Sequence, residues 1–265
     1  MTYETILVSD VVDGVISVTL NRPEVLNSYN DQMCEEIQSF WIDMKNDQRV
    51  RAIVLTASGD RAFCTGVDVK ERLASESAFG DRERPWAELS DPGSALGPKR
   101  NELWKPVIAA VKGMCAGGAA YLIAECDVVI CSPDATFFDP HVTYGLVAAL
   151  EPIMLSYRMH PSDALRMAIM GLHERISAER ALTCGLVTEI CEAGGIVERA
   201  VELAGLIASQ PPVAVQGTIK AFWRSLDLGR DQALASALMY TQIGNPIATE
   251  GLDRAASKPR SPAIR

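Results

Sequence analysis

The chain alternates short, almost wholly apolar runs with longer amphipathic stretches, and this pattern predicts a mixed α/β fold. Three apolar runs stand out: residues 51–57 (RAIVLTA), 106–111 (PVIAAV) and 127–131 (DVVIC). Strands that are apolar at nearly every position are buried on both faces. Because stretches of helical character separate these runs, we expect α/β architecture with partly parallel sheets.

The first 46 residues predict a β-hairpin followed by a helix. Two β-branched runs within residues 6–20 flank Asp13-Gly14, a dipeptide that readily adopts a type I′ turn. Asn30 is a suitable N-cap for a helix that reaches about residue 46. Apolar side chains recur on one face of this helix. They are Met33, Ile37, Phe40, Trp41 and Met44.

The remaining pattern separates a polar segment from a mainly helical C-terminal half. Residues 75–99 are rich in charge, Gly, Pro and Ser, so they form either a solvated loop or a lid over a site. From about Ser162 the chain is predicted to be mainly helical, with one helix starting at Pro211-Pro212. Residues 258–265 are expected to form a loose tail.

Composition narrows the classes of function. The chain has 265 residues, 48% of them hydrophobic, which suits one globular domain with a sizeable core. A net charge of −9 argues against a nucleic-acid partner, although a local basic cluster can still hold a phosphorylated ligand. Seven cysteines without a CxxC pair indicate reduced thiols and no zinc site. With no signal-peptide pattern and no apolar run long enough to span a bilayer, we expect a soluble, cytoplasmic protein without a membrane partner.

Two glycine-bearing turns carry the strongest chemical signal. Residues 61–70 (RAFCTGVDVK) and 111–121 (VKGMCAGGAAY) each lead from an apolar strand into a helix. Taken alone, each turn is also typical of an ordinary strand–helix connection, and neither matches GxGxxG or GK[ST]. Gly117-Gly118 lets backbone N–H groups approach a ligand, and a helix start favours negative charge. One N–H from each turn could therefore converge on a carbonyl oxygen and form an oxyanion hole.

These motifs resemble the crotonase, or enoyl-CoA hydratase/isomerase, family. The resemblance runs through residues 20–28 (LNRPEVLNS), 62–71 (AFCTGVDVKE), 105–119 (KPVIAAVKGMCAGGA) and 174–187 (ERISAERALTCGLV). It implies a crotonase-like spiral of ββα units in residues 1–200, which carries a CoA groove and an oxyanion hole. It also implies a C-terminal helical trimerisation region in residues 201–265, a homo-trimer or hexamer, and an acyl-CoA substrate with no cofactor beyond that CoA.

The resemblance also assigns individual residues. The oxyanion donors are expected to be the N–H groups of Val67 and Gly118. Residues expected to line the CoA groove or to reach the CoA phosphates are Leu26, Thr65, Asp68, Lys70, Lys258 and Arg260.

The chain departs from the hydratases of this family at both catalytic glutamates, which hold one water between them. Tyr121 and His141 stand at those two positions. Histidine, with an ordinary pKa near 6.5, can act as an acid or base near neutral pH, whereas tyrosine, with a pKa near 10, is rarely a base. Tyr121 is also consistent with a core residue of an apolar helix, and His141 with a structural histidine. We therefore expect slow or absent hydration of simple enoyl-CoA thioesters.

Three acidic residues are candidate helpers. Asp139 and Glu151 flank His141 in the sequence. A retro-Claisen hydrolase branch of the family pairs a histidine at this place with an acid at the place of Leu150, one residue before Glu151. Glu125 follows Tyr121 by one helical turn and either shares its face or is an ordinary helix charge.

The sequence thus favours an enzyme that transforms acyl-CoA through a thioester enolate, with His141 as the acid/base and Tyr121 as a second catalytic residue. Two alternatives stay open. One is a C–C bond hydrolase of a cyclic or β-keto acyl-CoA, and the other is a non-catalytic CoA-binding subunit.

Overall fold

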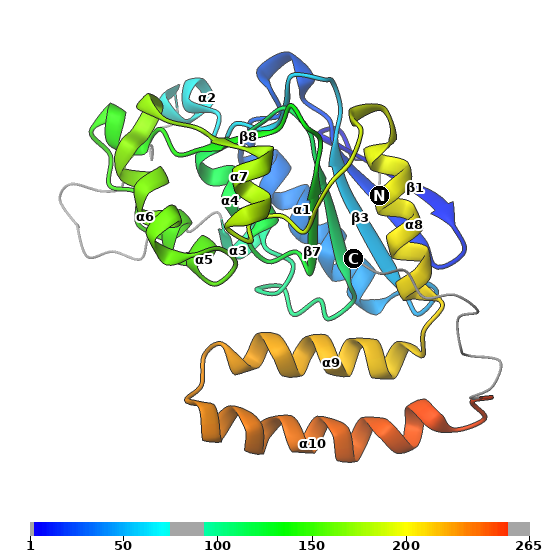
Figure 1. Ribbon diagram of the computed structural model, residues 1–265. Coiled ribbons are helices and arrows are strands. Elements are labelled where there is room, and N and C mark those ends of the chain that lie inside the picture. The colour runs from blue at the N-terminus through cyan, green and yellow to red at the C-terminus, as the bar shows by residue number, and fades with distance from the viewer. Residues whose placement is uncertain (1–2, 75–92, 254–265) are drawn as a thin grey trace. The chain divides into compact units, whose positions relative to one another are not determined.

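The computed structural model describes residues 3–74 and 93–253 (Figure 1). These belong to two compact units, Met1–Ala208 and Ser209–Arg265. The predicted boundary between residues 200 and 201 falls inside the last helix of the first unit, α8 (Ile196–Ala208). Most of the segment predicted to be a loop or lid lies outside the described residues, as do Lys258 and Arg260.

Within the described residues, the first unit contains a six-stranded sheet with the order β1-β2-β3-β5-β7-β10. The first two strands pair antiparallel, and every later pair of neighbours is parallel. The three predicted apolar strands are therefore confirmed as β3, β5 and β7. The strands are β1 (Ile6–Val12), β2 (Val15–Leu20), β3 (Ala52–Ala57), β5 (Val107–Val111), β7 (Val128–Cys131) and β10 (Glu189–Ile190).

The predicted hairpin is confirmed, but its turn is not of type I′. A type I′ turn needs positive φ at both central residues. Gly14 has φ 74°, whereas Asp13 is not among the residues with positive φ. The strand register also shifts between Asp10 and Val12. One extra residue of β1 is thus accommodated in a bulge, which adds the twist that a type I′ turn would otherwise provide.

A second sheet has the order β4-β6-β8-β9, with the first three strands parallel. Each of β3, β5 and β7 is followed by one strand of this second sheet and then by helical turns. The chain therefore repeats a ββα unit, as the resemblance implied. The strands are β4 (Ala62–Cys64), β6 (Met114–Ala116), β8 (Thr136–Phe138) and β9 (Ile176–Ser177).

The central strands β3, β5 and β7 are almost wholly apolar because helices cover both faces of their sheet. Alternate residues of β3 belong to different core clusters: Ile53 and Leu55 pack with α1, and Val54 packs with α8. Figure 1 shows α1 (Asp31–Asn46) and α8 on opposite sides of β3. Each fully buried Ile or Leu of this layer contributes about 1.5–3 kcal/mol of hydrophobic stabilisation.

Local capping chemistry sets several helix boundaries. Asn30 is confirmed as the N-cap of α1, since its side chain accepts a hydrogen bond from the Met33 N–H. Ser177 caps α7 in the same way. The other helices of the first unit are α2 (Val69–Ala74), α3 (Gly93–Leu96), α4 (Ala120–Ile123), α5 (Leu150–Ser156), α6 (Pro161–Met170) and α7 (Ala178–Thr183).

The second unit is a pair of helices, α9 (Pro212–Ser225) and α10 (Arg230–Thr249), which pack side by side (Figure 1). Pro212 occupies the first turn of α9, as predicted. Among the described residues, no helix combines the length and the apolar character needed to cross a bilayer.

Candidate active site

Three segments that carry predicted site residues follow three neighbouring strands of the second sheet. The turn with Val67 follows β4, the turn with Gly118 follows β6, and the segment with His141 follows β8. These strands are parallel neighbours. Because the carboxyl ends of parallel strands lie at the same edge of a sheet, the three segments meet there.

The first turn is held by the backbone of Tyr29. The Tyr29 N–H donates to the Gly66 carbonyl at 2.9 Å, and the Asp68 N–H donates to the Tyr29 carbonyl at 2.8 Å. This is a parallel bridge between Tyr29 and Val67. In such a bridge the intervening residue directs its own N–H to the opposite side. Within the described chain, the Val67 N–H has no hydrogen-bond partner.

The second turn lies against the backbone of the first. A Cβ atom placed on Gly66 would lie 3.0 Å from the Gly118 nitrogen and 3.2 Å from the Ala116 carbonyl oxygen. Gly66 also has φ 85°, so both its conformation and its surroundings require glycine. Gly118 is the second residue of the 3₁₀ turn η2 (Gly117–Ala119), ahead of the first intrahelical donor. As far as the structure describes the chain, the Gly118 N–H is also unpaired.

The third segment places His141 between two buried carboxylates. The distance from His141 Nδ1 to Asp139 Oδ1 is 2.6 Å, and the His141 backbone N–H donates to the same oxygen at 2.9 Å. His141 Nε2 lies 3.9 Å from Glu151 Oε1. Asp139 and Glu151 are 1% and 6% exposed. The hydrogen bond to Asp139 raises the pKa of His141; burial opposes this shift, and the charges of Asp139 and Glu151 add to it.

The His141 ring borders the second glycine turn. A Cβ atom on Gly117 would lie 3.5 Å from His141 Cε1. A small cavity between these elements is lined by Gly117, Asp139 and Glu151 together with apolar side chains. Asp139 Oδ2 is buried and has no hydrogen-bond partner among the described residues. The site therefore holds unsatisfied polar groups next to the turn with the free N–H.

Asp139, His141 and Glu151 could also hold a cation. Ligand atoms of the three side chains all lie within 4.8 Å of one another. Carboxylate and imidazole ligands suit divalent metals such as Mn²⁺ or Zn²⁺. However, the short bond to Asp139 already engages Nδ1 of His141, which favours an acid/base role for the ring.

The residues predicted to line the CoA groove occupy different environments. Thr65 Oγ1 donates to the Leu26 carbonyl at 3.5 Å, so these two positions are adjacent. Asp68 is buried and forms a 3.1 Å ion pair with Arg22, which indicates that it braces the turn. Lys70 is exposed.

Two residues near the second turn lie inside the protein. Tyr121 is 4% exposed and belongs to the main core cluster.

Glu125 is not an ordinary exposed helix charge. Its buried carboxylate accepts the backbone N–H groups of Lys99 and Arg100 at 2.7 and 2.9 Å, and burial raises its pKa. Glu125 thus anchors the loop that precedes β5.

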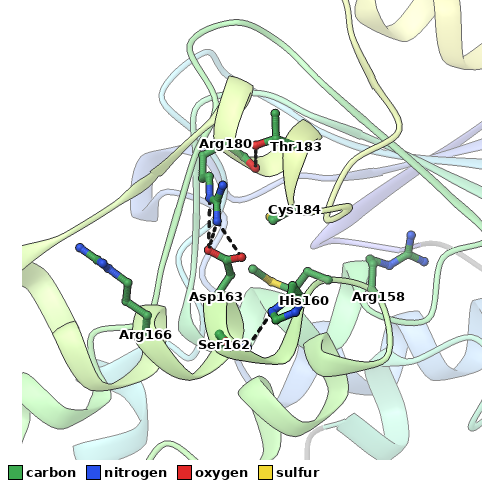
Figure 2. Close-up of a pocket in the computed structure, with 9 residues that line it drawn as sticks. Arg158, His160, Ser162, Asp163, Arg166, Arg180, Thr183 and Cys184 are labelled. Carbon is green, nitrogen blue, oxygen red and sulfur yellow. Dashed lines mark hydrogen bonds and ion pairs between the residues drawn. The ribbon is translucent and has the colours of Figure 1, made fainter.

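A wider cleft lies elsewhere, between the start of α6 and the end of α7 (Figure 2). Two of its arginines form ion pairs with acidic side chains. Arg180 binds Asp163 at 2.7 Å, and Arg166 binds Glu174 at 2.6 Å. His160 accepts the Ser162 N–H at 3.3 Å and so caps α6. Arg158 also lines this cleft, and its buried Nε has no hydrogen-bond partner among the described residues. A guanidinium keeps its protons near neutral pH, so this group is a donor only and cannot exchange a proton as His141 can.

Comparison with known proteins identifies the family. Residues 10–254 match the model of the enoyl-CoA hydratase/isomerase family. The chain belongs to the enoyl-CoA hydratase/isomerase (crotonase) family. It is therefore an enzyme of the crotonase family, with the fold of its hydratases, and acyl-CoA chemistry is the function that its relatives support.

Individual relatives show how varied the reactions of crotonases are. The chain is 32% identical over 262 residues to (E)-benzylidenesuccinyl-CoA hydratase of Thauera aromatica, with 97% of each chain covered. It is 31% identical to 1,2-epoxyphenylacetyl-CoA isomerase of Escherichia coli, covering 85% of this chain and 87% of the relative. The crystal structure of an enoyl-CoA hydratase/isomerase from Mycobacterium paratuberculosis superposes with a TM-score of 0.82 at 38% identity, covering 98% and 95%.

The sequence did not point to Tyr29, which lies directly before the N-cap of α1. The residue type could have indicated a role for Tyr29, because a tyrosine at a core position carries a hydroxyl that needs a hydrogen-bond partner.

Proposed function

We propose that this crotonase binds an acyl-CoA thioester, stabilises its enolate with the N–H groups of Val67 and Gly118, and uses His141 as the acid/base. The observation that carries the proposal is the 2.6 Å bond between His141 Nδ1 and the buried carboxylate of Asp139. A carboxylate on Nδ1 fixes the ring orientation and the tautomer, and it leaves Nε2 to exchange a proton with substrate or water.

The two N–H groups supply the electrostatic part of the mechanism. They are unpaired among the described residues, and their turns are in backbone contact through Gly66. Such donors act on the negative charge that develops on the thioester oxygen, and removing one typically costs about 10²–10³ in rate. The substrate brings its own CoA, so the proposed chemistry needs no further cofactor.

Glu151 extends the acid/base role of His141. A gap of 3.9 Å between Nε2 and Glu151 Oε1 is too long for a direct hydrogen bond, but a water can contact both atoms. His141 and Glu151 would then hold a nucleophilic water in place of the two glutamates of the hydratases. With Tyr121 at the other glutamate position, no second carboxylate stands there to protonate the α-carbon.

The same water favours a more specific second candidate, hydrolysis of a C–C bond in a cyclic or β-keto acyl-CoA. There His141 takes a proton from the water as the water oxygen attacks the β-carbonyl, and the bond between the α-carbon and that carbonyl breaks. The oxyanion hole accepts the resulting enolate, and the protonated His141 then gives the proton to the α-carbon. The CoA groove residues Leu26, Thr65, Asp68 and Lys70, and assembly into a homo-trimer or hexamer, belong to the proposal as the family resemblance implies them.

Steady-state turnover of a panel of acyl-CoA thioesters tests this function. We expect β-ketoacyl-CoA or cyclic β-diketone thioesters to react much faster than crotonyl-CoA, and His141→Ala to lose about 10²–10⁴ in kcat/KM. His173→Ala is the matched control, because His173 is exposed on a separate 3₁₀ turn. Crotonyl-CoA turnover at ordinary hydratase rates would remove the argument from the missing glutamates. Tight binding without turnover of any thioester would favour a non-catalytic CoA-binding subunit.

A further inference from the structure

Tyr29 is a buried tyrosine whose hydroxyl has no hydrogen-bond partner among the described residues. The residue is 3% exposed. Tyrosine hydroxyls in the interior normally find a partner. The Tyr29 hydroxyl oxygen is not one of the fully enclosed atoms without a partner, so it borders space that a ligand or water can reach. The side chain thus resembles one that completes its hydrogen bonding with a bound molecule.

The hydroxyl lies directly against Gly118. A Cβ atom on Gly118 would overlap with the Tyr29 hydroxyl, and it would lie only 2.9 Å from Tyr29 Cζ. Gly118 does not have positive φ, so the backbone conformation itself would accept a side chain. Glycine is required at position 118 because the Tyr29 side chain occupies the space of a Cβ atom.

The position of the hydroxyl relates it to the Gly118 N–H. In a helical residue both the Cα–Cβ bond and the N–H lean towards the beginning of the helix. The Tyr29 hydroxyl, which fills the Cβ space of Gly118, therefore lies on the same side as that N–H. The backbone of Tyr29 meanwhile holds Gly66 and Asp68 on either side of Val67. One residue thus contacts both glycine turns.

We propose that the Tyr29 hydroxyl donates a third hydrogen bond to the thioester oxygen of the acyl-CoA, beside the N–H groups of Val67 and Gly118. This inference rests on the proposed function. Burial, together with nearby groups that include Cys64, Tyr121 and Glu151, raises the pKa of Tyr29. The hydroxyl therefore keeps its proton and acts as a donor, not as a base.

Calorimetric titration with two ligands tests this role. The first ligand is butyryl-CoA, and the second is S-butyl-CoA, a thioether that lacks the carbonyl oxygen. We expect the wild-type protein to prefer the thioester. Tyr29→Phe should weaken butyryl-CoA binding about five- to tenfold and leave S-butyl-CoA binding unchanged. Tyr157→Phe, at a residue that is 60% exposed, is the matched control.

A second measurement addresses the charged oxyanion. Acetoacetyl-CoA forms an enolate with a distinct ultraviolet absorbance, and oxyanion donors lower the pH at which the bound enolate appears. In Tyr29→Phe that pH should move upward, whereas a packing role alone would leave it unchanged. The expected enolate destabilisation is about tenfold or more, because hydrogen bonds to charged groups are stronger.

The outcomes separate this inference from the proposed function. A wild-type protein that binds both butyl ligands equally would overturn the oxyanion hole itself. If the wild-type protein prefers butyryl-CoA over S-butyl-CoA and Tyr29→Phe keeps that preference in full, only the role of Tyr29 is overturned. If Tyr29→Phe weakened the binding of butyryl-CoA and S-butyl-CoA by the same factor, the proposed role of Tyr29 would also be overturned. The hydroxyl would then shape the groove without contacting the thioester oxygen.

Discussion

The ion pairs of the cleft between α6 and α7 differ from the buried carboxylates of the site at the ends of β4, β6 and β8. In the cleft, Arg180 and Arg166 are largely exposed, and each binds an acid on a nearby segment. At the site, Asp139 is almost fully buried, and its Oδ2 has no partner among the described residues. Open space alone therefore does not locate the chemistry. Arg158 Nε in the cleft is also buried without a partner among the described residues, but arginine does not exchange its protons near neutral pH. The better indicator is a buried, unsatisfied group beside a side chain that can exchange a proton, as Asp139 lies beside His141.

Of the variants Gly118→Ala, Asp139→Asn and Arg180→Gln, Gly118→Ala is expected to have the largest effect. The new Cβ would overlap with the Tyr29 hydroxyl and displace either the ring or the Gly118 N–H. We expect a loss of about 10²–10³ in kcat, as for removal of an oxyanion donor. Steady-state kinetics on the best thioester of the panel measures it.

Gly217→Ala is the matched control for this change. Gly217 lies within α9, and a Cβ atom added there would meet no neighbouring atom within 4 Å among the described residues. Alanine there should stabilise the helix by about 0.5–1 kcal/mol. If Gly118→Ala were as active as Gly217→Ala, the second turn would not be the source of rate enhancement.

A smaller effect with a characteristic pH dependence is expected for Asp139→Asn. The pKa of His141 is raised chiefly by its hydrogen bond to Asp139. As a base, His141 works only above that raised pKa, so kcat/KM should rise with pH and then level off. Asp139→Asn should move the midpoint to lower pH and reduce the plateau about 10²-fold, because the ring loses its orienting carboxylate.

Because the pKa of His141 is raised by folding, the free energy of unfolding also depends on pH. A histidine whose pKa is raised by folding stabilises the protein fully below its unfolded pKa, near 6.5, and this contribution is lost as pH rises through the folded pKa. Asp139→Asn should flatten that dependence in thermal unfolding measured across this range. A pH–rate midpoint that stays unchanged in the variant would argue against the His141–Asp139 pair as the titrating unit.

The smallest effect is expected in the cleft. Arg180→Gln removes an exposed ion pair with Asp163, and such pairs contribute about 0–1 kcal/mol. Thermal unfolding should change by no more than a few degrees, and kcat/KM should stay within about twofold of the wild type. A large loss of activity would show that the cleft takes part in the function, and the comparison between the two regions would fail.

Local sequence was sufficient for most of the fold. The apolar runs predicted β3, β5 and β7 because strands buried on both faces carry few polar side chains. Asn30 predicted the start of α1 because a side-chain acceptor there satisfies a free N–H. The turn at Asp13-Gly14 was wrong in type, since the bulge in β1 depends on how two strands pair and not on the dipeptide alone.

The sequence by itself determined the family and the two glycine turns, because these are matters of residue type and spacing, and it predicts that Tyr121 and His141 replace both hydratase glutamates. Only the tertiary structure brought Glu151 to His141 and the Tyr29 hydroxyl to Gly118. Where a side chain points depends on the packing of segments that are far apart in the chain, and no local pattern encodes that direction. The unsatisfied groups at the site exist only once the fold has excluded water from them.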